Sequence, residues 1–102
     1  METECFNEKK ITQLKEKIED VSADSINVFK ALGHEKRLQV YQLLKEEACC
    51  VCDLAHAFEA PVSTISQYLK VLKNAGLISS KNDGKFLIYS VTNLDPSQIL
   101  KL

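Results

Sequence analysis

Three of the four cysteines in the chain lie within four positions, at Cys49, Cys50 and Cys52. Thiolates are soft ligands that select zinc and its heavier relatives, so this crowding indicates a site for a soft metal or metalloid ion. Three thiolates suit trivalent arsenic or antimony, and four suit cadmium, lead or zinc. Cys49 and Cys52 also have the Cys-x-x-Cys spacing of a redox motif, so the cluster has two chemical interpretations.

No other pattern in the sequence indicates catalysis. The chain lacks a Gly-x-Ser-x-Gly element, a phosphate-binding loop and a His-Glu-x-x-His pair. His34 and His56 have no partner at ligand spacing, so we expect surface or capping roles for both. His56 lies four residues after Cys52 and is the stronger ligand candidate of the two. We therefore expect that the chain is not an enzyme.

Length and composition favour one small globular domain. The chain has 102 residues, of which 45% are hydrophobic and 26% are charged, as is ordinary for such a domain. No apolar run approaches the ~20 residues of a membrane span, and the polar start of the chain does not resemble a signal peptide. We expect a cytoplasmic protein with no membrane partner, whose thiols stay reduced.

Charge is distributed unevenly along the chain, although the net charge is only −1. Residues 1–59 carry an excess of acidic side chains. By contrast, residues 60–94 hold Lys70, Lys73, Lys81 and Lys85 against the single acid Asp83. A basic segment in a nearly neutral chain is compatible with a polyanion partner.

Hydrophobic periodicity predicts the elements that must position these side chains. Apolar residues at spacings of three and four predict helices over residues 11–32, 35–45, 51–58 and 63–76. The first helix can break at the polar residues 22–25, and Ser63 can cap the last one. After Gly76 the period changes to two, which predicts strands over 77–81 and 85–91 around an Asn82-Asp83-Gly84 turn. Residues 95–102 can add one or two helical turns.

Two short helices joined by a tight break and followed by a β-hairpin form a winged helix-turn-helix. The predicted fold class is therefore α+β, mostly helical, with a two-stranded hairpin as the wing. We expect residues 1–102 to form one such DNA-binding domain, with residues 1–10 as a mobile N-terminal arm. The helix at 63–75 would be the recognition helix, because residues 63–76 contain no Asp or Glu to repel DNA.

We expect this helix and the wing to bind double-stranded DNA. Gln67 is the best base reader, because an amide can pair bidentately with adenine. The other expected contacts to phosphate or bases are Ser63, Thr64, Ser66 and Lys70, together with Lys85 in the wing.

The sequence resembles the ArsR/SmtB family of metal- and arsenic-sensing winged-helix repressors. The matching stretches are residues 31–44, the Cys-Val-Cys-Asp-Leu element at 50–54, and residues 63–78 and 83–90. The resemblance implies a homodimer that binds an operator palindrome and lets go when an effector binds. It also implies that Cys50 and Cys52 are effector ligands, and that Cys5, on the N-terminal arm of the other subunit, is the candidate for a further one.

The chain departs from this family in two places. Ala55 stands where some arsenic sensors of the family place a third cysteine. Residues 95–102 offer Asp95 but no histidine for the zinc site that other members carry on a C-terminal helix. We therefore expect that the C-terminal site is absent and that residues 11–32 make much of the dimer contact.

Helix geometry bears on which cysteines share one ion. Residues two apart point about 200° apart on a regular helix, so Cys50 and Cys52 can share an ion only if the helix starts near Val51 or its first turn distorts. Cys49 and Cys52 are three apart and would share a helix face, so Cys49 is a candidate third ligand. The third ligand stays open between Cys49 and Cys5.

The sequence thus predicts a transcriptional repressor that is released from operator DNA by an ion bound at the cysteine cluster. The ion would be As(III), Sb(III) or a soft divalent metal such as cadmium, lead or zinc, with no organic cofactor. Two alternatives stay open. One is a repressor that senses oxidation through Cys49 and Cys52, and the other is a winged-helix module that binds protein rather than DNA.

Overall fold

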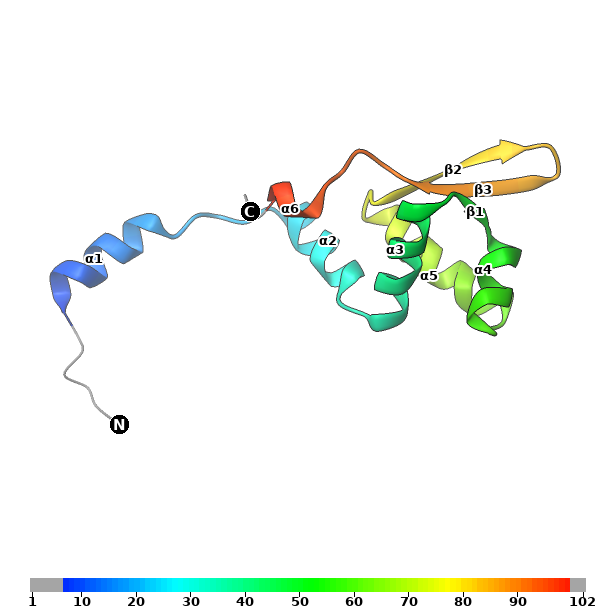
Figure 1. Ribbon diagram of the computed structural model, residues 1–102. Coiled ribbons are helices and arrows are strands. Elements are labelled where there is room, and N and C mark those ends of the chain that lie inside the picture. The colour runs from blue at the N-terminus through cyan, green and yellow to red at the C-terminus, as the bar shows by residue number, and fades with distance from the viewer. Residues whose placement is uncertain (1–6, 100–102) are drawn as a thin grey trace.

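The computed structural model describes residues 7–99, which form a mostly helical fold with one antiparallel sheet (Figure 1). The helices are α1 (Glu8–Lys17), α2 (Ala23–Leu32), α3 (Glu35–Glu46), α4 (Val51–Phe58), α5 (Val62–Asn74) and α6 (Pro96–Ile99). The strands are β1 (Cys49–Cys50), β2 (Ile78–Asp83) and β3 (Phe86–Val91). The predicted winged helix-turn-helix is confirmed, with α4 and α5 as its two helices and β2–β3 as its wing.

The core lies between helices α2 to α5 and the base of the sheet. Ile65, Leu69 and Leu72 of α5 are at most 1% exposed and form an apolar stripe at i, i+4 and i+7. Other buried residues come from the neighbouring elements: Val28, Ala31, Val40, Tyr41, Leu44, Leu54, Ala55, Leu77 and Ile78. This cluster holds α5 against the rest of the fold and leaves its other side exposed.

Only some of the apolar residues of α3 are buried. Val40, Tyr41 and Leu44 lie in the core, whereas Leu38 and Leu43 are 37% and 42% exposed. A helix buries a stripe rather than its full circumference. Since these five residues cover most directions around α3, the packed neighbours decided which of them lie inside.

The sheet has the strand order β1-β3-β2, so a third strand joins the predicted hairpin. Cys49 pairs with Tyr89 and Cys50 with Ile88, while β2 pairs with β3 from Ile78–Val91 to Asp83–Phe86. The predicted Asn82-Asp83-Gly84 turn is therefore misplaced, because Asn82 and Asp83 belong to β2. The two-residue turn is Gly84-Lys85, where Gly84 has the positive φ of +65° that glycine accepts without strain.

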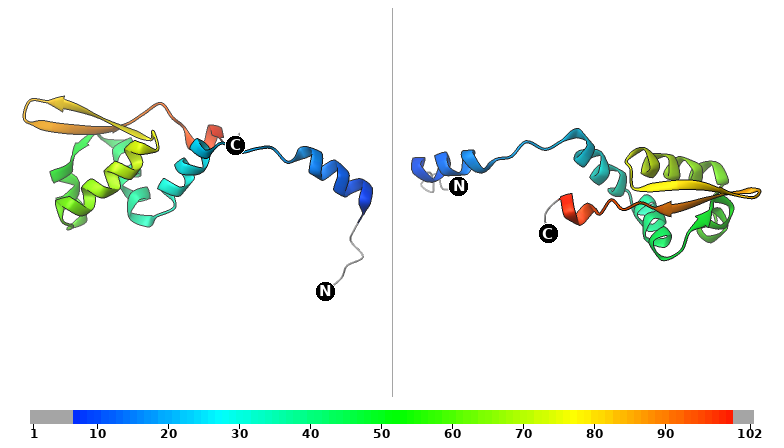
Figure 2. Two further views of the ribbon diagram at one scale, coloured as in Figure 1. Left: turned by 180° about the vertical axis from the view of Figure 1, so that it is seen from behind. Right: turned by 90° about the horizontal axis from the view of Figure 1, so that it is seen from above.

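Helix α1 lies apart from the other helices, at the opposite end of the molecule from the wing (Figures 1 and 2). It contains no buried residue. Its first turn is capped by Asn7, whose side-chain oxygen accepts a hydrogen bond from Lys10 N at 3.0 Å. Residues 8–10 are therefore helical, whereas the sequence predicted them to be part of a mobile arm.

The break between α1 and α2 falls at residues 18–22, close to the predicted polar segment. Ser22 caps α2 by accepting a hydrogen bond from Ser25 N at 3.1 Å, and Gly33 ends that helix. Toward the other end of the chain, Asp95 accepts hydrogen bonds from Ser97 directly before α6 begins at Pro96. None of the helices in residues 7–99 is long and apolar enough to cross a membrane.

Candidate functional site

Helix α4 begins immediately after Cys50. Cys50 is the N-cap residue, with φ −87° and ψ 165° in the extended region, and its backbone pairs with Ile88 of β3. Cys52 is the second residue of the helix. The late helix start that the sequence allowed is thus confirmed, and the 200° separation of a regular helix does not apply to Cys50 and Cys52.

Cys49 lies in β1 and not in a helix, so the argument that Cys49 and Cys52 share a helix face is wrong. Its Sγ–H donates a hydrogen bond to the Glu47 carbonyl oxygen at 3.3 Å. Burial raises the pKa of the Cys49 thiol, and the nearby carboxylates of Glu47 and Asp53 raise it further. Cys49 therefore stays protonated at neutral pH, unlike the low-pKa thiolates of redox sites.

The sulfur groups differ in accessibility. Cys49 and Cys50 are half-buried, while Cys52 is exposed. Within residues 7–99, no three His, Cys, Asp or Glu side chains gather closely enough to hold a metal ion. Cys5 lies outside the described residues. A soft ion at Cys50 and Cys52 would need a further ligand that moves in, from Cys49, Cys5 or solvent.

The two histidines have different surroundings. His34 has the capping role that the sequence predicted, because its Nδ1 accepts a hydrogen bond from Lys36 N at 3.2 Å and so caps α3. Its ring also lies 5.3 Å from the ring of Tyr68 on α5. His56 is exposed on α4, and it lines a surface cavity together with Cys52.

The exposed side of α5 carries the residues expected to read DNA. Ser63, Ser66, Gln67 and Lys70 are all exposed, and Thr64 is half-buried. Ser63 does not cap the helix as predicted, since α5 begins one residue earlier and Pro61 is its N-cap. The extended conformation of Pro61 (ψ 146°) ends the preceding turn, so Ser63 lies inside the first helical turn.

The turn between α4 and α5 is held by backbone hydrogen bonds. Glu59 has a left-handed conformation with φ 50°, and the N–H groups of Glu59 and Ala60 bond to the carbonyls of His56 and Ala55. Such a helix ending is compact, so the connection between α4 and α5 has little freedom to change its conformation. Movement at α4 is therefore expected to reach α5 directly.

The wing is joined to α5 by a polar contact. Lys73 Nζ donates a hydrogen bond to Ser80 Oγ of β2 at 2.7 Å. Lys81 and Lys85 are exposed on the hairpin, so the wing presents two cations to solvent. Lys73 thus has a positioning contact that its place in the sequence did not indicate.

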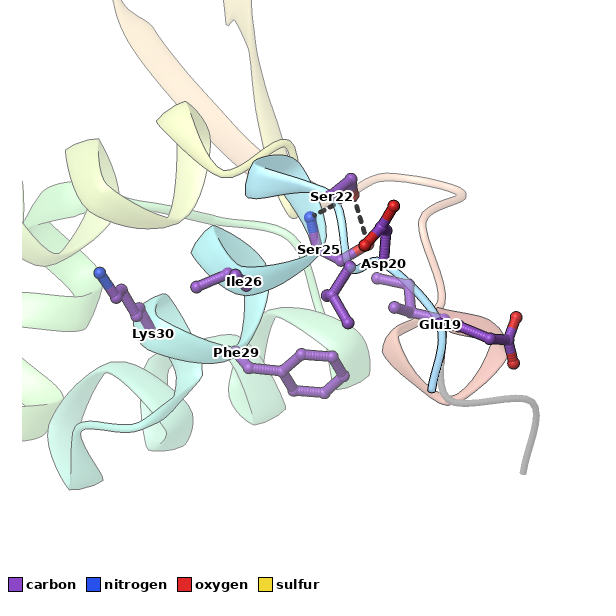
Figure 3. Close-up of a pocket in the computed structure, with 9 residues that line it drawn as sticks. Glu19, Asp20, Ser22, Ser25, Ile26, Phe29 and Lys30 are labelled. Atoms are coloured by element: carbon purple, nitrogen blue, oxygen red, sulfur yellow. Dashed lines mark hydrogen bonds between the residues drawn. The ribbon is translucent and has the colours of Figure 1, made fainter. Parts of the chain in front are cut away.

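A groove at the start of α2 has a volume of about 770 Å³. It is lined by Val21, Ile26 and Phe29 and by Ile99 of α6. Figure 3 shows Ile26 and Phe29 beside the Ser22–Ser25 hydrogen bonds that cap the helix. This segment belongs to residues 11–32, which are expected to make dimer contact, but no sequence pattern indicates a groove there.

Comparison with known proteins gives a consistent family. The model of the arsR family of bacterial regulatory proteins matches residues 34–80. The cadmium resistance transcriptional regulatory protein CadC of Listeria innocua is 35% identical over 99% of this chain and 87% of its own length. The arsenical resistance operon repressor of Bacillus subtilis is 37% identical over 71% of this chain and 70% of its own length.

A solved structure supports the fold at similar coverage. The homodimeric winged helix-turn-helix DNA-binding domain from Mycobacterium bovis superposes with a TM-score of 0.68 at 25% identity, covering 82% of this chain and 84% of that one. These relatives are transcriptional regulators rather than enzymes. The chain belongs to the arsR family of bacterial regulatory proteins and is a winged helix-turn-helix transcriptional regulator.

Proposed function

We propose that this protein is a homodimeric repressor that leaves its operator when a soft metal or metalloid ion binds Cys50 and Cys52. The observation that carries the proposal is the position of Cys50, which is both the N-cap of α4 and a partner of the wing strand β3. Ligation at this residue acts on two DNA-binding elements at once. A repressor that acts on operator DNA would work in the cytoplasm.

Operator binding is assigned to α5 and the wing. Gln67 reads a base, and Ser63, Thr64, Ser66 and Lys70 contact phosphate or base edges, as the exposure of most of these side chains allows. Lys85 contacts a phosphate, an assignment that its exposed place in the hairpin turn supports. The absence of acidic residues on α5 supports DNA over an acidic protein surface as the partner.

Dimer formation is assigned to the N-terminal helices. Leu14, Ile18 and Val21 are 50%, 77% and 64% exposed, and exposed apolar side chains that lie close together in the chain are typical of an interaction surface. Val21 also lines the groove beside Phe29. A second copy of the chain would cover these surfaces. The homodimeric domain from Mycobacterium bovis supports this assignment.

Ion binding would be transmitted along two paths. One leads from α4 through the compact Glu59 turn to α5, and the other leads from β1 to β3 and the wing. When Cys50 and Cys52 bind one ion, the first turn of α4 shifts. This shift moves α5 and the wing out of the positions in which they fit the operator. A tenfold loss of DNA affinity needs only about 1.4 kcal/mol of coupling, and DNA must weaken ion binding by the same factor.

The names of the relatives fit a soft effector. CadC is a cadmium resistance regulator, and the Bacillus subtilis relative is an arsenical resistance repressor. Thiolates bind both kinds of ion. We assign the third ligand to Cys49 or Cys5; using Cys49 requires breaking its hydrogen bond to Glu47 and deprotonating a thiol whose pKa is raised.

The test uses the reduced full-length protein and an operator selected from random DNA. Cadmium chloride or sodium arsenite is titrated while thiolate-to-ion absorption and DNA anisotropy are recorded together. The Cys50→Ser, Cys52→Ser double variant should bind the operator like the wild type and ignore the ion. Ion-dependent release of this double variant would refute the proposal, as would release of the wild type by a metal-free oxidant together with a Cys49–Cys52 disulfide. Single Cys49→Ser and Cys5→Ser variants identify the third ligand.

A further inference from the structure

Cys52 and His56 lie one turn apart on the exposed side of α4. The helix is continuous from Val51 to Phe58, so these residues occupy positions i and i+4 on one face, with Cβ atoms about 5–6 Å apart. Both side chains are exposed. This is the spacing at which two side chains of one helix bind a single metal ion.

The same two residues line one surface cavity of about 530 Å³. Glu59 and Pro61, from the turn that follows α4, form its far side. The cavity has room for an ion and its water ligands beside the Cys52 sulfur. Within residues 7–99, no further His, Cys, Asp or Glu side chain completes a metal-binding group with these two as the chain stands, so two of the four positions of a tetrahedral ion are left for water or for a residue that moves in, such as Cys50.

We propose that His56 is a ligand for divalent ions, binding them together with Cys52 and selecting them over arsenite. The inference rests on the proposed cysteine sensor and adds a ligand that is not among the cysteines of that sensor. On binding, the Cys52 thiol releases its proton to solvent and the neutral imidazole of His56 donates a lone pair. No electron is transferred. Imidazole suits zinc and other borderline divalent metals, whereas arsenite is bound through thiolates, so His56 stabilises only the divalent complex.

The test titrates the reduced, metal-free, full-length protein with cobalt(II), whose visible absorption reports tetrahedral sulfur and nitrogen ligands, and separately with arsenite. His56→Gln should raise the Kd for cobalt by at least about tenfold, since even outer-shell changes at metal sites cost that much. Its Kd for arsenite should change less than about twofold. His34→Asn is the matched control, because asparagine keeps the cap of α3 and removes the other histidine.

The outcomes separate this inference from the proposed function. Equal cobalt affinity in wild type and His56→Gln overturns the inference while the cysteine sensor stands. An equal loss of cobalt and arsenite affinity in His56→Gln also overturns it, because that pattern indicates damage to α4 rather than a lost ligand. If Cys52→Ser binds both ions like the wild type, the proposed sensor fails as well. The inference is supported if His56→Gln loses affinity for cobalt but not for arsenite, while His34→Asn keeps the cobalt affinity of the wild type.

Discussion

Cys50 pairs with Ile88 across the β1–β3 ladder, so the residue that begins α4 is also part of the sheet that carries the wing. A strand of two residues has few bonds of its own and depends on β3 for its position. Any ligand that pulls on the Cys50 sulfur therefore acts on the wing as well as on the helix-turn-helix.

The Gln67→Ala variant should relax sequence preference. The amide of Gln67 is exposed on α5, where it can pair with adenine, and loss of one bidentate contact costs about 1–3 kcal/mol of discrimination. The ratio of operator to non-operator affinity, measured by anisotropy at one salt concentration, should fall accordingly. Gln98→Ala, on the exposed side of α6, is the control and should keep the ratio of the wild type.

Lys70→Ala and Lys85→Ala should each weaken binding to all DNA sequences alike. Each lysine is expected to neutralise one phosphate, so its removal should lower the slope of log affinity against log salt by about one unit. The measurement is a salt series from low to physiological ionic strength. Lys9→Ala, on exposed α1, should leave the slope unchanged. If Lys70→Ala and Lys85→Ala both keep the salt slope of the wild type, the proposed DNA interface is wrong.

Replacing apolar residues in α1 and directly after it should disrupt the dimer. Leu14→Asp with Ile18→Asp places two charges where the proposed interface buries apolar surface, and unpaired charges are strongly disfavoured there. Sedimentation should show monomers at concentrations where the wild type is dimeric. Phe86→Asp at the wing, 56% exposed in the chain, is the control; a dimeric α1 variant would assign the interface elsewhere.

The Leu72→Ala variant should lose about 2–5 kcal/mol of unfolding free energy, as large-to-small changes in a close-packed core do. Leu72 is fully buried between α5 and its neighbours. Urea denaturation at fixed protein concentration measures the change. Leu87→Ala, at a position that is 40% exposed, should change the unfolding free energy much less.

The alkylation rate of Cys49 should rise at a higher pH than the alkylation rate of an ordinary cysteine. Burial and the Glu47 and Asp53 carboxylates raise the pKa of this thiol, so its reactive thiolate forms at higher pH than in an ordinary cysteine. Glu47→Gln removes one of these charges and should raise the alkylation rate of Cys49 at pH 8, as followed by peptide mass spectrometry. An unchanged or lower rate would show that the carboxylate does not control this thiol.

Much of the fold and of the candidate site was predictable because the signals are local. The bounds of α4 and the start of α3 agree with the periodicity, since apolar spacing and nearby caps determine where a helix lies. The exposed residues of α5 followed from its apolar stripe. Local signals misled where two of them competed, as when Pro61 rather than Ser63 became the N-cap of α5.

The tertiary structure alone decided the features that depend on residues distant in sequence. Cys49 and Cys50 form a strand only because Tyr89 and Ile88 pair with them, and a two-residue strand has no period to detect. Leu38 and Leu43 are 37% and 42% exposed, because the helices that pack on α3 within residues 7–99 cover its other side. The sequence by itself determined the helices, the wing and the cysteine cluster, through local periodicity and residue chemistry. Long-range packing decided that Cys50 belongs to both α4 and the wing sheet, because pairing partners nearly forty residues away leave no local signal.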